Sequence, residues 1–127
     1  MYIKFLLLSG PAPASDLQRF KADFFKALAH PIRIRLLEVL RVRERNVQEL
    51  QAALGLDQST VSQQLAVLRA KHVVVARKEG TTVRYAVRDP LVGNLLDVAR
   101  RIFNNQLAGT RTMLRELQRE ARRPARR

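Results

Sequence analysis

The sequence predicts a mainly α-helical fold that carries one β-hairpin. Apolar residues recur at helical spacing along most of the chain, whereas residues 73–87, "VVVARKEGTTVRYAV", are β-branched and alternate around a Glu-Gly-Thr turn. The chain has 127 residues, the length of one domain, and carries 24 Lys and Arg against 11 Asp and Glu. The net charge of +13 favours a polyanionic partner such as DNA, RNA or an anionic membrane surface.

Two terminal segments differ in composition from the predicted domain, which we place at residues 15–118. Residues 1–14 form a lead that runs into the turn-rich stretch "SGPAPAS", and an extra strand, a misplaced start and a disordered segment all fit its composition. Residues 119–127 form a basic tail without apolar periodicity, which we expect to be disordered. The apolar run "YIKFLLLSG" is too short for a signal peptide or for the about 20 residues of a membrane span, so we expect a cytoplasmic protein without membrane contact.

The first two predicted helices meet at the stretch "AHP". Ser15 and Gln18 have the spacing of a capping box, which begins a helix with an apolar stripe. That stripe consists of Leu17, Phe20, Phe24 and Leu28. His30 is placed to cap the second helix and Pro31 to begin it, since proline suits the first helical position.

Two shorter helices and the hairpin follow. Asn46 and Glu49 again have capping-box spacing, and Gly55 stands where a helix ends in a left-handed residue. Asp57 then caps a fourth helix that contains "STVSQQLAVLRA". Two short helices joined by a tight glycine turn and followed by a hairpin are the parts of a winged helix-turn-helix.

A long last helix completes the predicted set of five helices and a two-stranded wing. Asp89 and Pro90 supply its cap and its first position. Its apolar stripe consists of Leu91, Leu95, Val98, Ile102, Phe103, Leu107, Leu114 and Leu117.

The fourth helix has one apolar stripe and one face of short, uncharged side chains. In a helix-turn-helix the second helix lies in the DNA major groove with its N-terminal residues against the base edges. Glutamine can pair with adenine through two hydrogen bonds, serine can donate or accept, and an alanine methyl can contact thymine. We therefore predict base contacts by Ser59, Thr60, Ser62, Gln63 and Ala66.

Positive charge flanks this reading segment but does not enter it. No Lys or Arg occurs from Asn46 to Leu68, whereas both neighbouring segments are rich in them. Such a division suits a protein whose flanks hold phosphates while its centre reads bases. The predicted backbone or wing contacts are Gln58, Gln64, Arg69, Arg77, Lys78, Thr81, Arg84 and Tyr85. RNA is less favoured, because its deep major groove does not admit a reading helix.

Residues 19–100 resemble the ArsR/SmtB family of small bacterial transcriptional regulators. The resemblance rests on "KALAHPIRIRLLEVL", on "VQELQAALGLDQSTVSQQLAVLRAKHVVVARKEGTTVRYAV" and on the following "DP". It implies a symmetric homodimer that binds a palindromic operator, with repression relieved by a signal. It also implies a dimer interface built from the first and last helices, here Leu17, Phe20, Phe24, Leu95, Ile102, Phe103, Leu107 and Leu114.

The chain departs from the family pattern at two positions and in its metal ligands. Gln64 stands where the family often has histidine, and His72 where it usually has glycine, so we expect His72 in a left-handed conformation. The absence of cysteine excludes thiolate metal sites, and the two histidines, His30 and His72, both have structural interpretations. We therefore predict no cofactor. The alternative is an unusual nickel or zinc site assembled from carboxylates and histidines of two subunits. A small organic molecule, a partner protein or no effector at all remain open as the signal.

No motif of the sequence points to an enzyme. A phosphate-binding glycine loop, a nucleophile with its base and a pair of acids in a plausible cleft are all missing. The competing functions are other binding modules, namely a DNA-compacting protein without sequence choice and a winged helix that binds proteins. The tail supports the first of these, because residues from Arg111 onward contain seven arginines and two glutamates.

Overall fold

The computed structural model describes residues 13–107 and 111–122 of the chain. Its elements, in chain order, are α2 (Asp16–Leu28), α3 (Pro31–Leu40), β1 (Arg45–Asn46), α4 (Val47–Leu54), α5 (Gln58–Ala70), β2 (Val74–Glu79), β3 (Thr82–Val87), α6 (Leu91–Gln106) and α7 (Arg111–Arg122). The fold is mainly helical with a small antiparallel sheet, as the sequence predicts. The lead predicted at residues 1–14 lies, up to residue 12, outside the described residues.

The predicted helix starts are confirmed at α2, α3 and α4, whereas α5 and α6 differ in their caps. Both capping boxes form, one between Ser15 and Gln18 and one between Asn46 and Glu49. His30 accepts a hydrogen bond at Nδ1 from the backbone N–H of Ile32, 3.1 Å away. Asp57 precedes α5, but its side chain makes no capping hydrogen bond. Pro90 is the N-cap of α6 and not its first helical residue, although Asp89 Oδ1 accepts from the Leu91 N–H at 2.9 Å.

The hydrophobic core lies between α3, α4 and α5 and is closed by the sheet. The predicted apolar stripe of α5, Val61, Leu65 and Leu68, is fully buried. These side chains pack with the equally buried leucines of α3 and α4, which are Leu36, Leu37, Leu40 and Leu50. Because one face of α5 is fixed in this core, its opposite face is presented to the exterior.

Residues 74–87 form the predicted hairpin, which is part of a three-stranded sheet with the order β1-β3-β2. The turn at Gly80 has a φ of 62°, and only glycine adopts this conformation without steric cost. The third strand, β1, was missed in the sequence, because two residues are too few to show alternation. β1 pairs Arg45 with Tyr85 and thereby ties the base of the hairpin to the start of α4.

The long helix predicted after residue 90 is two helices, so the described residues contain six helices rather than five. α6 ends at Gln106, and the N–H of its C-cap Leu107 donates to the Phe103 carbonyl at 2.8 Å. α7 extends four residues into the predicted tail, since Glu120 faces α6 and pairs with Arg100 at 3.0 Å. The last five residues of that tail lie outside the described residues.

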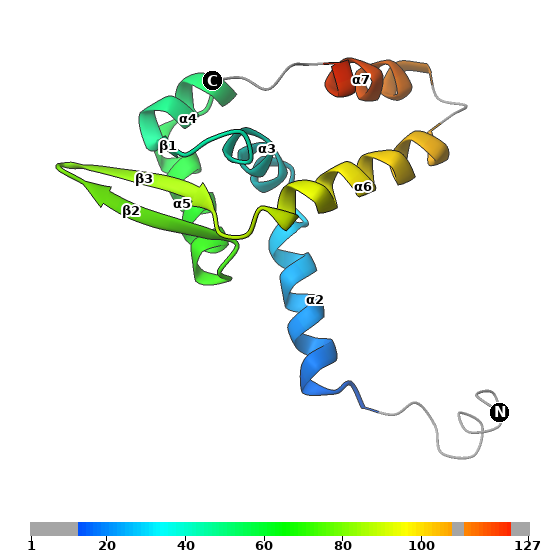
Figure 1. Ribbon diagram of the computed structural model, residues 1–127, viewed down its shortest axis with the longest axis horizontal. Coiled ribbons are helices and arrows are strands. Elements are labelled where there is room, and N and C mark those ends of the chain that lie inside the picture. The colour runs from blue at the N-terminus through cyan, green and yellow to red at the C-terminus, as the bar shows by residue number, and fades with distance from the viewer. Residues whose placement is uncertain (1–12, 108–110, 123–127) are drawn as a thin grey trace.

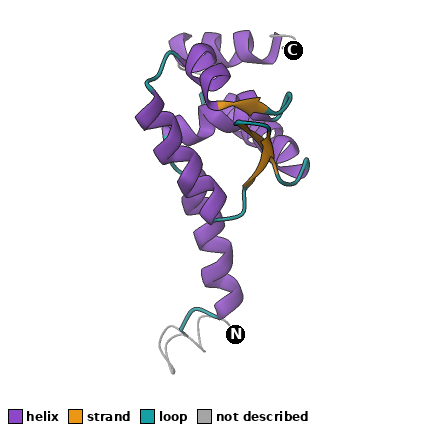
Figure 2. Ribbon diagram, turned by 90° about the vertical axis from the view of Figure 1, so that its left-hand side faces the viewer, coloured by secondary structure: helices purple, strands orange, loops and turns teal. Residues whose placement is uncertain are grey.

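Two helices project from the compact part of the molecule. Figure 1 shows α2 running away from the core and α6 leaving it in another direction, and Figure 2 shows the same arrangement from the side. α2 touches the core mainly through its C-terminal end, where Ala27 is buried and Phe24 and Leu28 are partly buried. No helix of the described residues has the length and apolar character needed to cross a membrane.

Candidate nucleic-acid interface

The exposed face of α5 carries most of the residues predicted to read bases. Ser59, Ser62, Gln63 and Ala66 are exposed, and at 100° per residue they fall within an arc of about 100°. Thr60 lies beside this arc and is half-buried. The face is therefore continuous and uncharged, and its hydroxyl, amide and methyl groups are of the kinds that contact base edges.

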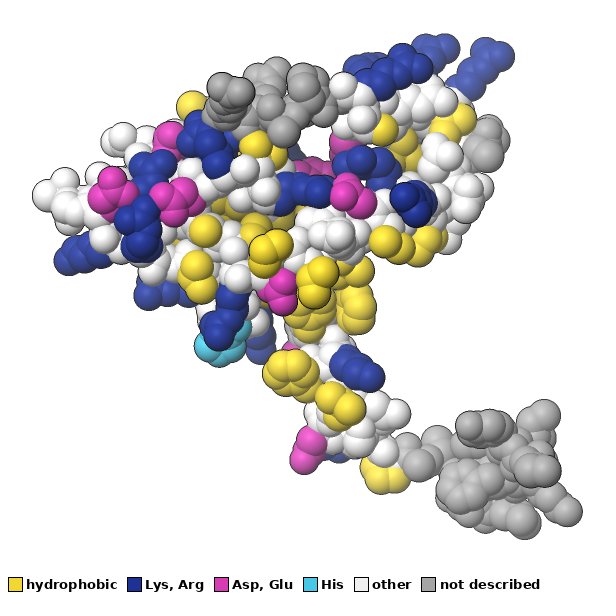
Figure 3. Space-filling view, in the orientation of Figure 1, with side chains coloured by type: hydrophobic (Ala, Val, Ile, Leu, Met, Phe, Trp, Pro, Cys, Tyr) yellow, Lys and Arg dark blue, Asp and Glu magenta, His cyan; other side chains and the backbone are white. Residues whose placement is uncertain are grey.

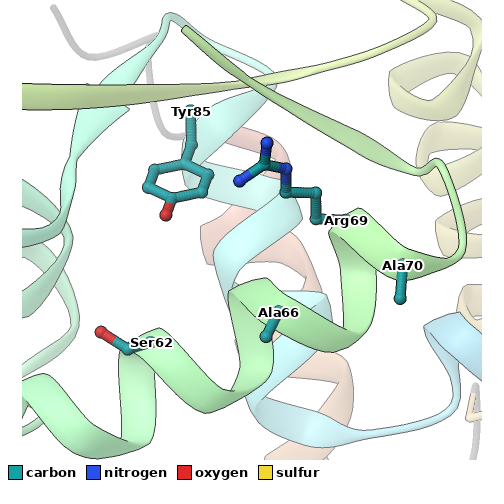
Figure 4. Close-up of a pocket in the computed structure, with 5 residues that line it drawn as sticks. All are labelled: Ser62, Ala66, Arg69, Ala70 and Tyr85. Atoms are coloured by element: carbon teal, nitrogen blue, oxygen red, sulfur yellow. The ribbon is translucent and has the colours of Figure 1, made fainter. Parts of the chain in front are cut away.

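The wing and α5 enclose an open hollow of about 410 Å³. It is lined by Ser62, Ala66, Arg69 and Ala70 of α5 and by Tyr85 of β3 (Figure 4). The close-up shows the Tyr85 ring and the Arg69 guanidinium next to each other on the wing side of the helix. Arg69 and Tyr85 are two of the predicted backbone contacts and are 16 positions apart in the sequence. The structure brings both beside the predicted base readers.

The cations of the wing divide between its two faces. Tyr85 is paired with Ala76 and Lys78 with Val83, and the pair of Arg77 and Arg84 lies between these two pairs. Because successive side chains of a strand point to opposite faces of the sheet, Tyr85 and Lys78 lie on one face of the hairpin and the two arginines on the other. Since Tyr85 lines the hollow, Lys78 is on the α5 side of the wing and the two arginines are on the other side.

Arg77 and Arg84 are held in a network of ion pairs on that other side. Arg77 donates to Glu44 and, at 3.1 Å, to Glu79, while Arg84 lies 3.3 Å from Glu44 and 3.4 Å from Glu49. The hydrogen bond to Glu44 raises the pKa of Arg77. Figure 3 shows these basic and acidic side chains interleaved over the hairpin. Their charge is largely neutralised within the protein, which the sequence prediction of two phosphate contacts did not anticipate.

Within residues 57–88, which contain α5 and the wing, four cations have no acidic partner in the described part of the chain. These are Arg69, Lys71, Lys78 and Arg88, of which Arg69 and Lys78 belong to the predicted set. Gln58 at the start of α5 and Thr81 at the wing tip are both exposed. Gln64 is half-buried, and its side-chain carbonyl accepts a hydrogen bond from Arg33 at 2.8 Å. Lys71 and Arg88 extend the basic surface beyond α5 and the hairpin.

The predicted dimer residues form apolar surface on α2, α6 and α7. Leu17 and Phe20 are 61% and 73% exposed, and Ile102 and Phe103 are 49% and 48% exposed. The remaining members are half-buried, namely Phe24, Leu95, Leu107 and Leu114, and Phe24 packs against the core. Figure 3 shows the apolar side chains along both projecting helices. Phe25, 58% exposed beside them on α2, was missed because it lies off the predicted stripe.

The comparison with known proteins assigns this architecture to a family. The family model described as "Bacterial regulatory protein, arsR family" matches residues 30–74, from the start of α3 to the start of β2. The uncharacterized HTH-type transcriptional regulator Rv0081 of Mycobacterium tuberculosis (strain ATCC 25618 / H37Rv) is 45% identical over 105 residues, which are 82% of this chain and 92% of that protein. The chain belongs to the ArsR family.

Solved structures agree with this assignment of the ArsR fold. The crystal structure of M. tuberculosis Rv0081 superposes with a TM-score of 0.69 and covers 76% of this chain and 97% of that chain. The homodimeric winged helix-turn-helix DNA-binding domain Mb0332 from Mycobacterium bovis, a possible ArsR-family regulator, is 30% identical with a TM-score of 0.67. It covers 80% of this chain and 97% of its own.

The two histidines of this ArsR-family chain have the structural positions that the sequence predicts. His30 caps α3, and His72 has a φ of 60°, the left-handed conformation that ends the turn after α5. Among the described residues, no three His, Asp or Glu side chains lie close enough together to hold a metal ion. The unusual nickel or zinc site would therefore need residues of a second subunit.

A bidentate ion pair joins α6 to the end of α3. The Arg41 guanidinium donates to both carboxylate oxygens of Asp97, at 2.7 and 2.8 Å. Gly93 makes room for it, because a Cβ at this position would lie 3.1 Å from Arg41 Nε. The hydrogen bond from Arg41 holds the pKa of Asp97 below its ordinary value. This pair could not be predicted from the sequence, since its members are 56 positions apart.

The stability contributed by this pair is expected to depend on pH. The folded-state pKa of Asp97 is lowered, so the contribution is present above the unfolded-state pKa of about 4 and is lost as the pH falls through the folded-state value. Asp97→Asn should lower the free energy of unfolding by about 0.5–1 kcal/mol at pH 7, a small figure because the carboxylate is half exposed. Denaturant titrations from about pH 7 to pH 2 should show this difference shrink towards the acid end.

Asp16→Asn is the matched control for the pH experiment. Asp16 pairs with Arg19 on the open surface of α2, and its side chain is fully exposed. Its replacement should change the free energy of unfolding by only a few tenths of a kcal/mol at any pH. Equal effects of the two substitutions would contradict a specific role of the Arg41–Asp97 pair.

Proposed function

We propose that this chain is a dimeric, sequence-specific DNA-binding transcriptional regulator that represses from a palindromic operator. The observation that carries the proposal is the exposed face of α5, where Ser59, Ser62, Gln63 and Ala66 form an uncharged reading surface. Arg69 and Tyr85 border this surface at the hollow. Short hydrogen-bonding side chains flanked by cations suit a helix that reads bases while its borders hold phosphates.

The exposed apolar faces of α2 and α6 support a second copy of the chain as the partner. Large apolar side chains exposed on neighbouring helices mark a protein interface. A two-fold dimer places its reading helices one DNA turn, about 34 Å, apart and thereby selects a palindromic site. The homodimer described for Mb0332 supports the dimer, and the names of two relatives support repression. These relatives are the transcriptional repressor SmtB homolog of Synechocystis and a probable mercury resistance operon repressor of Streptomyces lividans.

The signal that relieves repression is proposed to be a small organic molecule or a partner protein. The chain has no thiolate to offer a soft metal ion. Both of its histidines serve the backbone, one as a cap and one in a left-handed turn. No enzymatic activity and no resident cofactor are part of the proposal.

Selection of bound duplexes from a random DNA pool, at a stated salt concentration, tests the function. A regulator should yield a palindromic consensus and bind it about 10³-fold or more tightly than random DNA. The compacting alternative, which the +13 charge favours, predicts a ratio near one at every concentration from about 50 to 200 mM salt. A protein-binding winged helix predicts no DNA binding in that range. Either of the last two results would overturn the regulator.

The two faces of the wing are expected to differ in the salt dependence of DNA binding. Each phosphate neutralised contributes about 0.9 to the slope of log K against log salt, so Lys78→Ala should reduce that slope by about this amount. Arg77→Ala removes the same charge from the opposite face, where Glu44 and Glu79 already neutralise it, and should leave the slope nearly unchanged. Titrations at four or more salt concentrations measure both slopes. An equal reduction of the salt slope by Lys78→Ala and Arg77→Ala would show that the assignment of these residues to opposite faces of the wing is wrong.

A further inference from the structure

One guanidinium joins three helices of the molecule. Arg33 belongs to α3, and its Nε donates to the Ala27 carbonyl at 2.6 Å while its Nη2 donates to the Lys26 carbonyl at 3.3 Å. These carbonyls belong to the last turn of α2, where the Ala27 carbonyl has no backbone donor and the Lys26 carbonyl also accepts from the Ala29 N–H at 3.1 Å. The third nitrogen, Nη1, donates to Oε1 of Gln64 on α5, 2.8 Å away. Three bonds from one rigid fork hold Arg33 in a single position.

The bond from Arg33 fixes which end of the Gln64 amide points outward. Arginine can only donate, so the amide must turn its carbonyl oxygen toward Arg33 and its NH₂ group away. Among the described residues, Nε2 of Gln64 has no hydrogen-bond partner. It is also not one of the fully buried polar atoms that lack a hydrogen bond. The NH₂ group is therefore accessible to an acceptor from outside.

Gln64 lies on the side of α5 away from the wing. At 100° per residue it is about 140° around the helix from Ser59, whereas Ser62, Ala66 and Arg69 lie on the other side of Ser59. A helix in the major groove runs between the two phosphate backbones of the duplex. The wing side offers Arg69 and Lys78 to one strand. The half-buried Gln64 is placed to meet the other strand.

We propose that Gln64 donates from Nε2 to a phosphate oxygen of the strand opposite the wing, and that Arg33 is the positioning residue that holds the amide in this orientation. The inference rests on the proposed function and assigns one contact within it. A charge-assisted bond to the Gln64 carbonyl polarises the amide, which strengthens its N–H donors. The reading face beside it then keeps its register on the duplex, because contacts to the backbone position a protein without reading sequence.

Gln64→Met removes the donor with little change in side-chain length and tests the contact. Loss of a hydrogen bond to a charged acceptor should weaken binding to operator and to random DNA alike, by about tenfold or more. The salt slope should stay unchanged, because a neutral amide releases no counterion. Gln118→Met, an exposed glutamine on α7, is the matched control and should bind as wild type. Both variants should sediment as wild type, and Gln64→Met should stay folded with a somewhat lower free energy of unfolding, because Nη1 of Arg33 loses its acceptor.

Operators with a single neutral methylphosphonate at successive positions locate the phosphate. Wild type should lose affinity at one position on each half-site, on the strand opposite the wing, and Gln64→Met should lose nothing further there. Arg33→Lys keeps the charge but not the fork, so the cost of Gln64→Met should fall several-fold in that background.

Three results would overturn the inference while leaving the regulator intact. One is an operator-specific wild type whose affinity Gln64→Met does not change. Another is a Gln64→Met variant with altered base preference, which would make Gln64 a reader of bases. The third is full additivity of the Arg33→Lys and Gln64→Met effects. A wild type without operator preference would instead overturn the proposed function.

Discussion

Replacing Ile102 with glutamate is expected to produce a monomer that binds the operator about 10²–10⁴-fold more weakly than wild type. Ile102 is half exposed on α6 beside Phe103, in the apolar surface that we assign to the second copy. The free energy needed to bury an unpaired carboxylate there would exceed the stabilisation that the apolar contacts contribute. The monomer would then bind each half-site alone and lose the effective concentration that links the two reading helices. Sedimentation and operator titration measure both losses.

Val42→Glu is the matched control for the dimer prediction. Val42 is 37% exposed just after α3 and is not one of the predicted dimer residues, so the same apolar-to-acid change should leave the dimer intact. Binding to random DNA should also fall for the Ile102→Glu monomer, because it neutralises half as many phosphates as the dimer, whereas Val42→Glu should change it little. A wild-type protein that sediments as a monomer and still binds full operators would disprove the dimer assignment.

Local signals in the sequence predicted the framework of the fold well. Caps depend on residues three positions apart, which is why both capping boxes and the His30 cap could be predicted. The left-handed conformations at Gly55 and His72 follow from similarly local rules. The buried stripe of α5 follows from periodicity, and its burial leaves Ser59, Ser62 and Gln63 exposed.

Contacts between distant segments could not be predicted in the same way. The ion pairs that occupy Arg77 and Arg84 need Glu44 and Glu49, which lie more than 30 positions away. The pairing of Arg33 with Gln64 spans 31 positions. In the sequence each of these side chains counts as an available polar group, and only the fold shows which of them are already bound.

The end of the last helix shows a second limit of periodicity. The apolar stripe continues at helical spacing through residues 103–117, and this pattern predicted one helix. The apolar pattern shows which residues face a common surface. One long helix and two helices that pack on each other can both have this pattern, so it does not distinguish between them. Glu120 pairs with Arg100 because α7 packs against α6, a partnership that spacing along one helix cannot reveal.

Ser62→Ala combined with Gln63→Ala is expected to remove most of the operator preference. Each base contact that is lost should cost about 1–3 kcal/mol on the operator, and the two effects need not add because the residues are adjacent. Both side chains are exposed and outside the core, so the fold and the dimer should be unaffected. Binding to random DNA should hardly change, because no cation is lost.

The ratio of operator to random-DNA affinity is the quantity that decides this prediction. It should fall by roughly 10-fold to 10³-fold in the double variant, whereas Gln118→Ala on α7 should leave it unchanged. A drop in both affinities with a constant ratio would mean that Ser62 and Gln63 only position the protein, as backbone contacts do. Burial of Val61, Leu65 and Leu68 fixes which face of α5 points outward. The other exposed residues of that face, Ser59 and Ala66, or another element such as the wing tip around Gly80, would then have to read the sequence.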